Sequence, residues 1–332
     1  MRILFIGGTG NISTACTRLA LEAGYDVYHF NRGKSHDLFK KSIKQIHGDA
    51  YDIDSLKMAV KNQNFDVVVN FIAYLPEDVD RDIKVFSGKT SQYIFISSAS
   101  VYQKPPLYPI ITESTPRKNP YWQYSRDKID CEEYLEKAFR DNDFPMTIIR
   151  PSLTYESVIP VAIGSWDDFT IIDRIRQRKP IIVHGDGTSL WTITHSADFA
   201  IGFTGLLGHQ QAIGQTFHIT SDEILTWNQI YEAVAVAAGE EPIMVHIPSD
   251  FISQFDEFHV GNLLGDKAVS VIFDNTKIKS FVPEYKAVIP FIKGIQSTVK
   301  WFEEDPTRMV IKEENNAFMD KVIAAYQKIK YI

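Results

Sequence analysis

Residues 2–13 constrain the fold of this chain more than any other stretch. Their sequence, RILFIGGTGNIS, begins with a short apolar run, passes through small residues and continues directly into a helical pattern over residues 15–21. A strand, a tight glycine turn and a helix thus follow one another without a spacer, and the positive end of the helix dipole faces the turn. Gly7 permits the turn, Gly10 leaves room for phosphate, and Ser13 is small enough for helix and strand to pack closely. This arrangement predicts a site for the pyrophosphate of a dinucleotide, with an ordinary strand-to-helix turn as the alternative.

The composition is typical of a soluble globular protein large enough for two structural parts. The chain has 332 residues, of which 44% are hydrophobic and 23% charged. Its net charge of −7 disfavours nucleic acid as a partner, because phosphate binding needs a basic surface. The two cysteines, Cys16 and Cys131, show no metal-ligand spacing and suit a reducing compartment. With neither a signal-peptide pattern nor a membrane-length apolar run, we expect a cytoplasmic protein that binds no membrane and no metal.

Apolar stretches alternate with helical patterns through the first half of the chain. Strands are expected over residues 25–30, 43–47, 65–72 and 92–97. This alternation predicts an α/β fold, a Rossmann-type doubly wound parallel sheet with right-handed crossovers. The cofactor should lie across the carboxyl ends of the strands, which places Phe71, Ile72 and Ala73 at one strand end and Ser97 at the next.

The residues after the second expected strand bear on the choice of cofactor. NAD-dependent enzymes usually carry an acidic residue there, about 20 residues past the glycines, to hold the ribose 2′-hydroxyl. This chain has Asn31 and Arg32 instead, and a guanidinium suits a 2′-phosphate through charge-assisted contacts. We therefore favour NADP over NAD, and the alternative is a solvated arginine in a loop. Asp49, followed by Ala50 after the third strand, is placed to meet the adenine edge.

A second motif combines a tyrosine with a lysine. Tyr124 and Lys128 are four residues apart in an expected helix, so both project from one helical face. Tyrosine has a reference pKa of about 10 and is a poor base at neutral pH, but an adjacent ammonium and the positive nicotinamide ring nearby favour its phenolate. The Ser98 hydroxyl can then hold a carbinol or carbonyl oxygen while Tyr124 moves the proton. The Tyr-x-x-x-Lys spacing is common in structural helices, and its place after the fifth strand of a nucleotide-binding sheet is what favours catalysis.

Together these motifs resemble the extended and atypical short-chain dehydrogenase/reductases, the nucleotide-sugar epimerase/dehydratase group. The resemblance covers nearly the whole chain and rests on residues 7–12, 97–102, Glu113 with Pro116, and residues 124–128, 149–152, 184–187, 195–198 and 217–220. It implies that Ser98, Tyr124 and Lys128 are the catalytic trio and that Lys128 also holds the nicotinamide ribose. It further implies a homodimer built on a two-helix face.

The resemblance also assigns residues to the two ligands. It implies cofactor contacts from the glycine motif, the strand ends and the nicotinamide wall, which are Gly7, Thr9, Gly10, Asn11, Ile12, Asn31, Arg32, Asp49, Ala50, Phe71, Ile72, Ala73, Ser97, Tyr124, Lys128, Pro151, Ser152 and Leu153. The candidate substrate residues are Ser98, Ser100, Tyr102 and His195. For His195, a hydrogen-bonded structural histidine is the competing interpretation.

The chain departs from the nucleotide-sugar pattern in three places. Gln103 and Glu156 stand where these enzymes commonly place glycine. After Gly187, where they often carry an arginine that grips the nucleotide diphosphate, this chain reads TSLWT. The missing cation weakens the case for a UDP- or dTDP-sugar. In this respect the chain looks more like the atypical branch that includes chloroplast stem-loop-binding proteins.

Beyond residue 156 the alternation of strands and helices loosens. We expect residues 1–155 and 190–222 to form the NAD(P)-binding domain, and residues 156–189 and 223–332 to form a smaller mixed α/β substrate domain. Candidates for lining a pocket in the second domain are Trp166, Phe251, Phe255, Phe258 and His259, with core packing as the competing interpretation.

Three functional hypotheses follow. The first is an NAD(P)-dependent oxidoreductase of the epimerase/dehydratase type, acting on the carbinol of a small-molecule sugar or nucleotide sugar. The second is an NADPH-dependent reductase of small carbonyl compounds on the same scaffold. The third is a nucleotide- or RNA-binding relative with a vestigial active site, against which the intact trio and the acidic charge argue. The residues named do not separate epimerisation, dehydration and simple dehydrogenation, and they do not identify the substrate.

Overall fold

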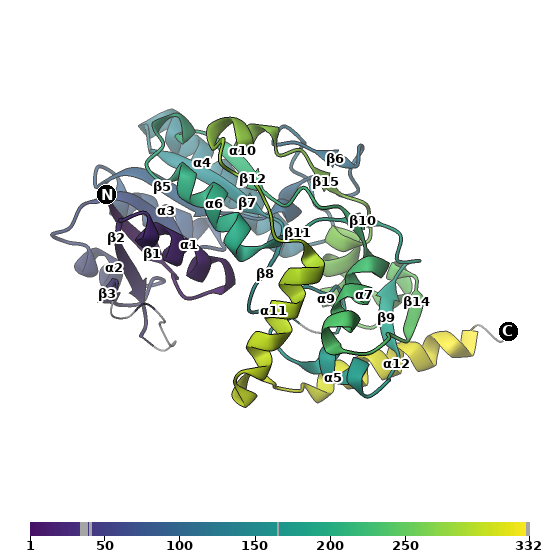
Figure 1. Cartoon of the computed structure of the whole chain (residues 1–332). Coiled ribbons are helices and arrows are strands. Elements are labelled where there is room, and N and C mark those ends of the chain that lie inside the picture. Colours follow the sequence, from purple (N-terminus) through teal and green to yellow (C-terminus); the bar gives the residue numbers. More distant parts are fainter. Residues whose placement is uncertain (34–38, 40–41, 165, 330–332) are drawn as a thin grey trace.

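A seven-stranded parallel sheet forms the core of the N-terminal part of the molecule (Figure 1). The computed structural model describes residues 1–33, 39, 42–164 and 166–329. In spatial order the strands are β12 (Thr216–Ile219), β7 (Met146–Pro151), β5 (Thr90–Ile96), β4 (Phe65–Asn70), β1 (Arg2–Ile6), β2 (Asp26–Asn31) and β3 (Lys44–His47). The chain builds outward from β1 to β3 and then resumes on the other side of β1 with β4. The topological switch therefore lies between β1 and β4, where such sheets bind ligands.

The register brings the carboxyl ends of the central strands to one level. Ile6, the last residue of β1, pairs with Phe30 of β2 on one side and with Asn70 of β4 on the other. Asn70 in turn pairs with Phe95 near the end of β5. Loops that leave these strands therefore meet at one edge of the sheet, next to the glycine turn.

Helices cover both faces of this sheet (Figure 1). One face carries α1 (Asn11–Glu22) and α6 (Ser196–Leu206), and the other carries α2 (Ile53–Ala59), α3 (Pro76–Phe86) and α4 (Gln123–Asn142). In α4 the buried Cys131, Leu135 and Ala138 recur at helical spacing and face the sheet. α3 and α4 pack side by side, as α1 and α6 do on the opposite face. Pairing of two chains on a two-helix face remains a prediction.

The second part of the molecule is a smaller α/β unit with its own apolar core. It contains the parallel pair β9 (Ile181–His184) and β14 (Met244–Ile247), with α5 (Thr170–Arg176), α7 (Trp227–Ala238), α11 (Phe291–Glu303) and α12 (Glu313–Ile329) around them (Figure 1). Three short strand pairs complete the sheets: β8 (Leu153–Tyr155) with β11 (Ile193–His195), β10 (Leu190–Trp191) with β13 (Leu225–Thr226), and β6 (Ile110–Ile111) with β15 (Ile272–Phe273). Short helical segments are η1 (Ala99–Val101), η2 (Gln210–Ala212), α8 (Ser249–Ile252), α9 (Glu257–His259), η3 (Val260–Lys267) and η4 (Pro306–Arg308).

One segment lies on the sheet part, although its sequence position suggested the second part. α10 (Thr276–Phe281) packs against α6 and β12, and Ile278 and Tyr285 belong to the apolar cluster on that face of the sheet. Gly205 of α6 makes this approach feasible, because a Cβ there would lie 2.4 Å from a methyl carbon of Val282. An isolated short helix has no periodic stripe long enough to show which core it joins.

The α/β class and the doubly wound parallel sheet expected from the sequence are confirmed. Within the part of the chain that the structure describes, no helix is both long and apolar enough to cross a membrane.

Candidate functional site

The glycine turn between β1 and α1 has the shape that a dinucleotide pyrophosphate needs. Gly7 adopts a left-handed φ of +84°, and a Cβ there would lie 2.5 Å from Ile72 at the end of β4. A Cβ at Gly8 would lie 2.5 Å from the imidazole of His29. α1 begins at Asn11 with no acidic residue in its first turn, so the positive end of its dipole is not neutralised locally. The residues present therefore fit a bound pyrophosphate.

Ser13 and Asn11 hold the turn in place. The Gly10 amide donates to Ser13 Oγ at 2.7 Å, so the serine that replaces a third glycine closes the turn itself. Asn11 donates through its side-chain amide to the Thr154 carbonyl at 3.2 Å and accepts from the Ser157 amide at 3.2 Å. This side chain therefore ties the start of α1 to β8. Of the neighbouring motif residues, Thr9 and Ile12 are half-buried.

The residues expected at the adenosine end follow β2 and β3. Asn31 Oδ1 accepts from the Gly33 amide at 2.8 Å, and Arg32 next to it is exposed. Asp49 Oδ1 accepts from the Tyr51 amide at 3.0 Å, so one carboxylate oxygen fixes its own turn, while Ala50 is buried. Arg32 thus remains accessible to an anion in solution.

Lys128 lies beneath the ends of β4 and β5. Its Nζ donates to the Ala73 carbonyl at 2.7 Å and to the Ile96 carbonyl at 2.9 Å, and it is fully buried. It also lies over the rings of Tyr74 and Phe95, each at 4.7 Å. Burial lowers the pKa of Lys128 from 10.5 to about 8. The ammonium therefore links two strand ends, directly below the predicted catalytic tyrosine.

Tyr124 and Ser98 face each other above this lysine. Burial raises the pKa of Tyr124, and its hydrogen bond with Ser98 offsets that effect only in part. The Lys128 ammonium lies 5.9 Å from the centroid of the tyrosine ring and is occupied by two carbonyls. Among the protein's own groups, desolvation is the largest influence on the pKa of Tyr124. Formation of its phenolate beside Lys128 and a bound nicotinamide ring stays a prediction.

A chain of hydroxyls continues from Ser98. Ser98 Oγ lies 2.9 Å from Ser100 Oγ, which accepts from Ser125 Oγ at 2.8 Å. Behind them Ser97, expected at the cofactor, donates from Oγ to the fully buried Glu132 at 2.6 Å. Glu132 also pairs with Arg150 at 2.5 Å, so this carboxylate anchors β7 to α4. The serine pair is therefore held by a rigid support.

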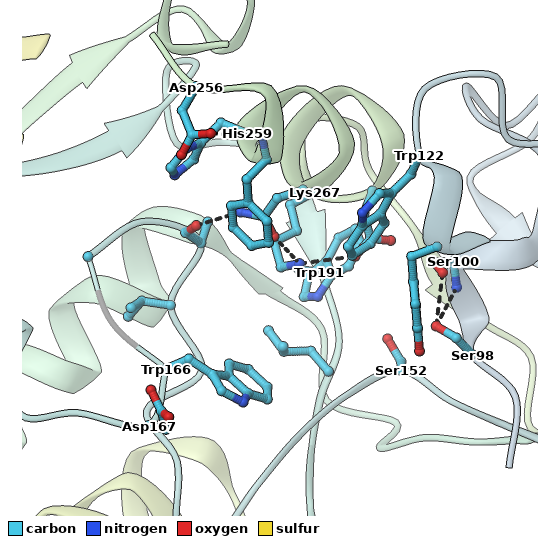
Figure 2. A pocket seen from close by; sticks show the side chains of 18 of the residues that line it. Ser98, Ser100, Trp122, Ser152, Trp166, Asp167, Trp191, Asp256, His259 and Lys267 are labelled. Carbon is cyan, nitrogen blue, oxygen red and sulfur yellow. Dashed lines mark hydrogen bonds and ion pairs between the residues drawn. The ribbon is translucent and has the colours of Figure 1, made fainter. Parts of the chain in front are cut away.

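A cavity of about 730 Å³ opens beside Ser98 and Tyr124 (Figure 2). Its lining comes from the loop after β5, the start of α4, the loop after β7 and, on the other side, residues of the second part. Of the expected wall of the nicotinamide site, Ser152 and Leu153 line it. The structure thus brings Ser98, Ser100 and Tyr124 to one end of a space large enough for a sugar-sized ligand.

Other predicted residues lie elsewhere. The Tyr102 hydroxyl is buried against His218 Nδ1 at 3.0 Å, and the Arg150 guanidinium lies over its ring at 4.7 Å. His195 Nδ1 accepts from the Ala197 amide at 3.1 Å and so caps α6. Neither side chain is among the cavity lining, and the structural interpretation of His195 fits its position. Phe71 likewise packs into the core, 5.4 Å from Phe5.

The aromatic candidates of the second part divide between cavity and core. Trp166, Phe258 and His259 line the cavity, whereas Phe251 and Phe255 pack on the apolar core. Most charged and tryptophan residues of the lining were not among the sequence candidates, and these are Lys104, Trp122, Asp167, Asp168, Trp191, Asp256, Asp266, Lys267, Lys312 and Glu314. Five of them, Lys104, Trp122, Asp167, Asp168 and Asp256, lie one or two residues from positions that the sequence did indicate. The others come from distant loops whose meeting the sequence does not indicate.

Comparison with known proteins agrees with this geometry. A model of the NAD dependent epimerase/dehydratase family matches residues 3–220. The chain is 28% identical over 265 residues to a chloroplast stem-loop binding protein of 41 kDa from Arabidopsis thaliana, covering 75% of this chain and 67% of the relative. It is 22% identical over 254 residues to 2′-dehydrokanamycin reductase from Streptomyces kanamyceticus, covering 76% and 71% of the two chains.

Solved structures show the same fold over nearly the whole chain. An epimerase from Methanothermobacter thermautotrophicus superposes with a TM-score of 0.76 at 17% identity, covering 93% of this chain and 94% of that one. The glycine turn, the parallel sheet and the match over residues 3–220 lead to one assignment. The chain belongs to the NAD dependent epimerase/dehydratase family of enzymes.

Proposed function

We propose that this chain is a nicotinamide-dependent oxidoreductase of the epimerase/dehydratase type that acts at a carbinol or carbonyl carbon of a sugar. The observation that carries the proposal is the position of Ser98 and Tyr124 at one end of a 730 Å³ cavity, above the buried Lys128 that links the ends of β4 and β5. A dinucleotide bound on the glycine turn would supply a nicotinamide ring that accepts or donates hydride.

The chain's own residues handle the oxygen and its proton. Ser98 is placed to hold the substrate oxygen, because its hydroxyl contacts Ser100 and Tyr124 at the cavity wall. Tyr124 moves the proton on or off that oxygen. Lys128 fixes the strand ends of the site through the Ala73 and Ile96 carbonyls and places a positive charge below the phenol. These roles serve hydride transfer at one carbon. The substrate then determines whether the reaction ends as epimerisation, dehydration or simple oxidation or reduction.

The second candidate is an NADPH-dependent carbonyl reductase. In that reaction Tyr124 donates the proton to the carbonyl oxygen, the reverse of its role in carbinol oxidation. The 22% identical relative named a reductase is in keeping with that direction.

The experiment for the catalytic proposal compares the turnover of wild type and Tyr124→Phe. Absorbance at 340 nm measures NADPH formation with a panel of sugars and NADPH oxidation with their keto forms. We expect turnover to fall by about 10²–10⁴, the usual contribution of a positioned acid or base, with unchanged cofactor affinity. Tyr121→Phe is the matched control, because Tyr121 is exposed near the start of the same helix and does not line the cavity. Unchanged turnover in Tyr124→Phe would remove this residue from the mechanism.

We further propose that the cofactor is NADP, held at its 2′-phosphate by Arg32. Arg32 follows the end of β2 and is exposed, where a guanidinium can reach an anion. We expect Arg32→Ala to weaken NADPH binding by roughly tenfold or more, the loss of one charge-assisted contact, and to leave NADH binding as it is. Titration of cofactor fluorescence measures both, with Arg140→Ala at an exposed site of α4 as the control. Equal NADPH affinity in Arg32→Ala would refute the 2′-phosphate contact.

A further inference from the structure

The cavity beside Ser98 has a second end with a different character. Figure 2 shows Ser98, Ser100 and Ser152 on one side, Trp122, Trp191 and Lys267 in the middle, and Trp166 with Asp167 and Asp256 with His259 on the far side. We call the far side the distal end and define it as residues 166–168, 256–259, Lys312 and Glu314. A substrate that extends from Ser98 along the whole cavity would contact the distal end with the part remote from its reacting carbon.

Every lysine that lines the cavity is already paired with a carboxylate. Lys104 Nζ and Lys267 Nζ lie 3.4 and 3.1 Å from the two carboxylate oxygens of Asp266. Lys312 Nζ lies 2.8 Å from Asp167 and 3.5 Å from Asp168. Among the described residues that line the cavity there is no arginine. A diphosphate entering here would therefore have to compete with these carboxylates for each cation.

The charge of the lining is acidic, and the excess lies at the distal end. Five acidic residues and three lysines line the cavity, and four of the five acids, Asp167, Asp168, Asp256 and Glu314, belong to the distal end with only Lys312 to balance them. The Asp167 and Asp256 side chains are 68% and 42% exposed, so a ligand can reach them. Burial lowers the pKa of His259, so this imidazole adds no positive charge at neutral pH.

The lining also offers contacts for sugar rings. Trp166 and Phe258 are 41% and 58% exposed at the distal end, and aromatic faces attract ammonium groups as well as apolar sugar faces. Trp191, in the middle of the cavity, is 2% exposed, and its indole nitrogen has no hydrogen-bond partner among the described residues. An indole N–H is only a donor, so it calls for an acceptor oxygen from a ligand.

We propose that the cavity binds an amino-substituted sugar that carries no nucleotide diphosphate, with a protonated amine at the distal carboxylates and a ring oxygen at Trp191. The reacting carbon lies at Ser98 and Tyr124, so this inference rests on the proposed function and adds the substrate class to it. Asp256 and Glu314 are its specificity-determining residues.

The test compares ligands that differ in charge but not in their sugar skeleton. Chitobiose freed of its acetyl groups carries two amines, whereas N,N′-diacetylchitobiose is neutral, and UDP-glucose presents a diphosphate. Isothermal titration of the full chain, saturated with NADP, gives the three dissociation constants near neutral pH. We expect the diamine to bind more tightly than the diacetyl compound, and UDP-glucose to bind most weakly. Tighter binding of UDP-glucose, or no detectable binding of the diamine, would overturn the proposal.

A double variant and its control test whether the distal carboxylates account for the preference for the diamine. Asp256→Asn combined with Glu314→Gln removes two charges, and asparagine keeps the cap that Asp256 provides to the Phe258 amide at 2.9 Å. We expect it to weaken binding of the diamine by roughly tenfold, from two partly exposed charge contacts, and to leave the diacetyl compound unaffected. Glu232→Gln with Glu284→Gln, exposed and outside the cavity lining, is the matched control. Equal losses in both double variants, or no loss in the first, would refute the distal contact.

A further variant tests Trp191. Trp191→Phe removes the indole donor and should weaken both disaccharides without changing NADP affinity; equal sugar affinity would refute this contact. The cofactor titration distinguishes a failure of the proposed function from a failure of the amino-sugar inference. Failure to bind NADP or NAD, or full activity in Tyr124→Phe, would refute the proposed function. Cofactor binding and Tyr124 dependence together with a preference for UDP-glucose would refute the amino-sugar inference alone.

Discussion

Replacement of Lys128 by methionine tests how the site is held together. Methionine has a similar length and is apolar, so it removes the buried charge and keeps most of the volume. Lys128 is fully buried and donates to the Ala73 and Ile96 carbonyls. The variant should lose turnover, because it removes the ammonium below Tyr124. The difference in unfolding free energy between wild type and Lys128→Met reports separately on the protonation of this lysine.

The magnitude follows from the pKa of Lys128, which burial lowers from 10.5 to about 8. One pKa unit corresponds to about 1.36 kcal/mol, so holding the ammonium in the folded protein costs about 3 kcal/mol at pH 7. The variant also leaves two carbonyls without a donor, at about 1–3 kcal/mol each. Because these effects oppose each other, the net change in unfolding free energy at a single pH is uninformative. The pH dependence of that change, in contrast, comes only from the titration of Lys128.

The sign of that dependence is fixed by linkage. Because the folded pKa of Lys128 lies below the unfolded one, the unfolded chain binds more protons between about pH 8 and pH 10.5. The cost of burying the charge is complete below this window and is relieved as pH rises through it. From pH 7 to pH 9.5, the wild type should therefore gain about 2 kcal/mol of unfolding free energy relative to Lys128→Met.

Urea unfolding without added cofactor at several pH values measures this difference. Lys61→Met is the matched control, since Lys61 is exposed just after α2, and its difference from wild type should stay constant with pH. A constant difference between wild type and Lys128→Met over the same range would refute the reasoning. It would show that Lys128 titrates in the folded protein as it does in water.

Two further substitutions test the support of the site. Glu132→Gln leaves the buried Arg150 without its carboxylate and should lower the free energy of unfolding by about 3–5 kcal/mol in urea titrations; a loss no larger than that of the exposed Glu133→Gln would contradict the buried pair. Gly8→Ala places a Cβ 2.5 Å from the His29 ring and should cost about 1–3 kcal/mol and weaken cofactor binding. Thermal unfolding checks it, and an unchanged midpoint would show that His29 moves aside freely.

Much of the cofactor half could be predicted because its signals are local. The strand, the glycine turn and the start of α1 lie within a dozen consecutive residues, and Gly7 has the left-handed φ that its position requires. The four-residue spacing of Tyr124 and Lys128 similarly follows from one turn of helix. Alternation of buried strands and helices was sufficient to predict the five strands β1 to β5, whereas β7 and β12, which complete the parallel sheet, were not among the expected strands.

The residues of the substrate cavity could not be predicted in this way, because distant segments of the chain contribute them. Asp256, Lys267 and Glu314 reach the same cavity from segments that share no periodicity with the residues around Ser98. Residue type alone did not reveal that His195 caps α6 or that Tyr102 is buried against His218. The position of α10 in the chain suggested the second part, but the helix joins the core of the sheet part.

The sequence by itself determined the strands β1 to β5, the glycine turn and the presence of Tyr124 and Lys128 on one helical face, because these depend on neighbours within a few residues. Only the tertiary structure decided the desolvation of Tyr124 and the pairing of the cavity lysines. Desolvation and ion pairing depend on which groups long-range packing brings within a few ångströms, and no local pattern in the chain encodes that distance.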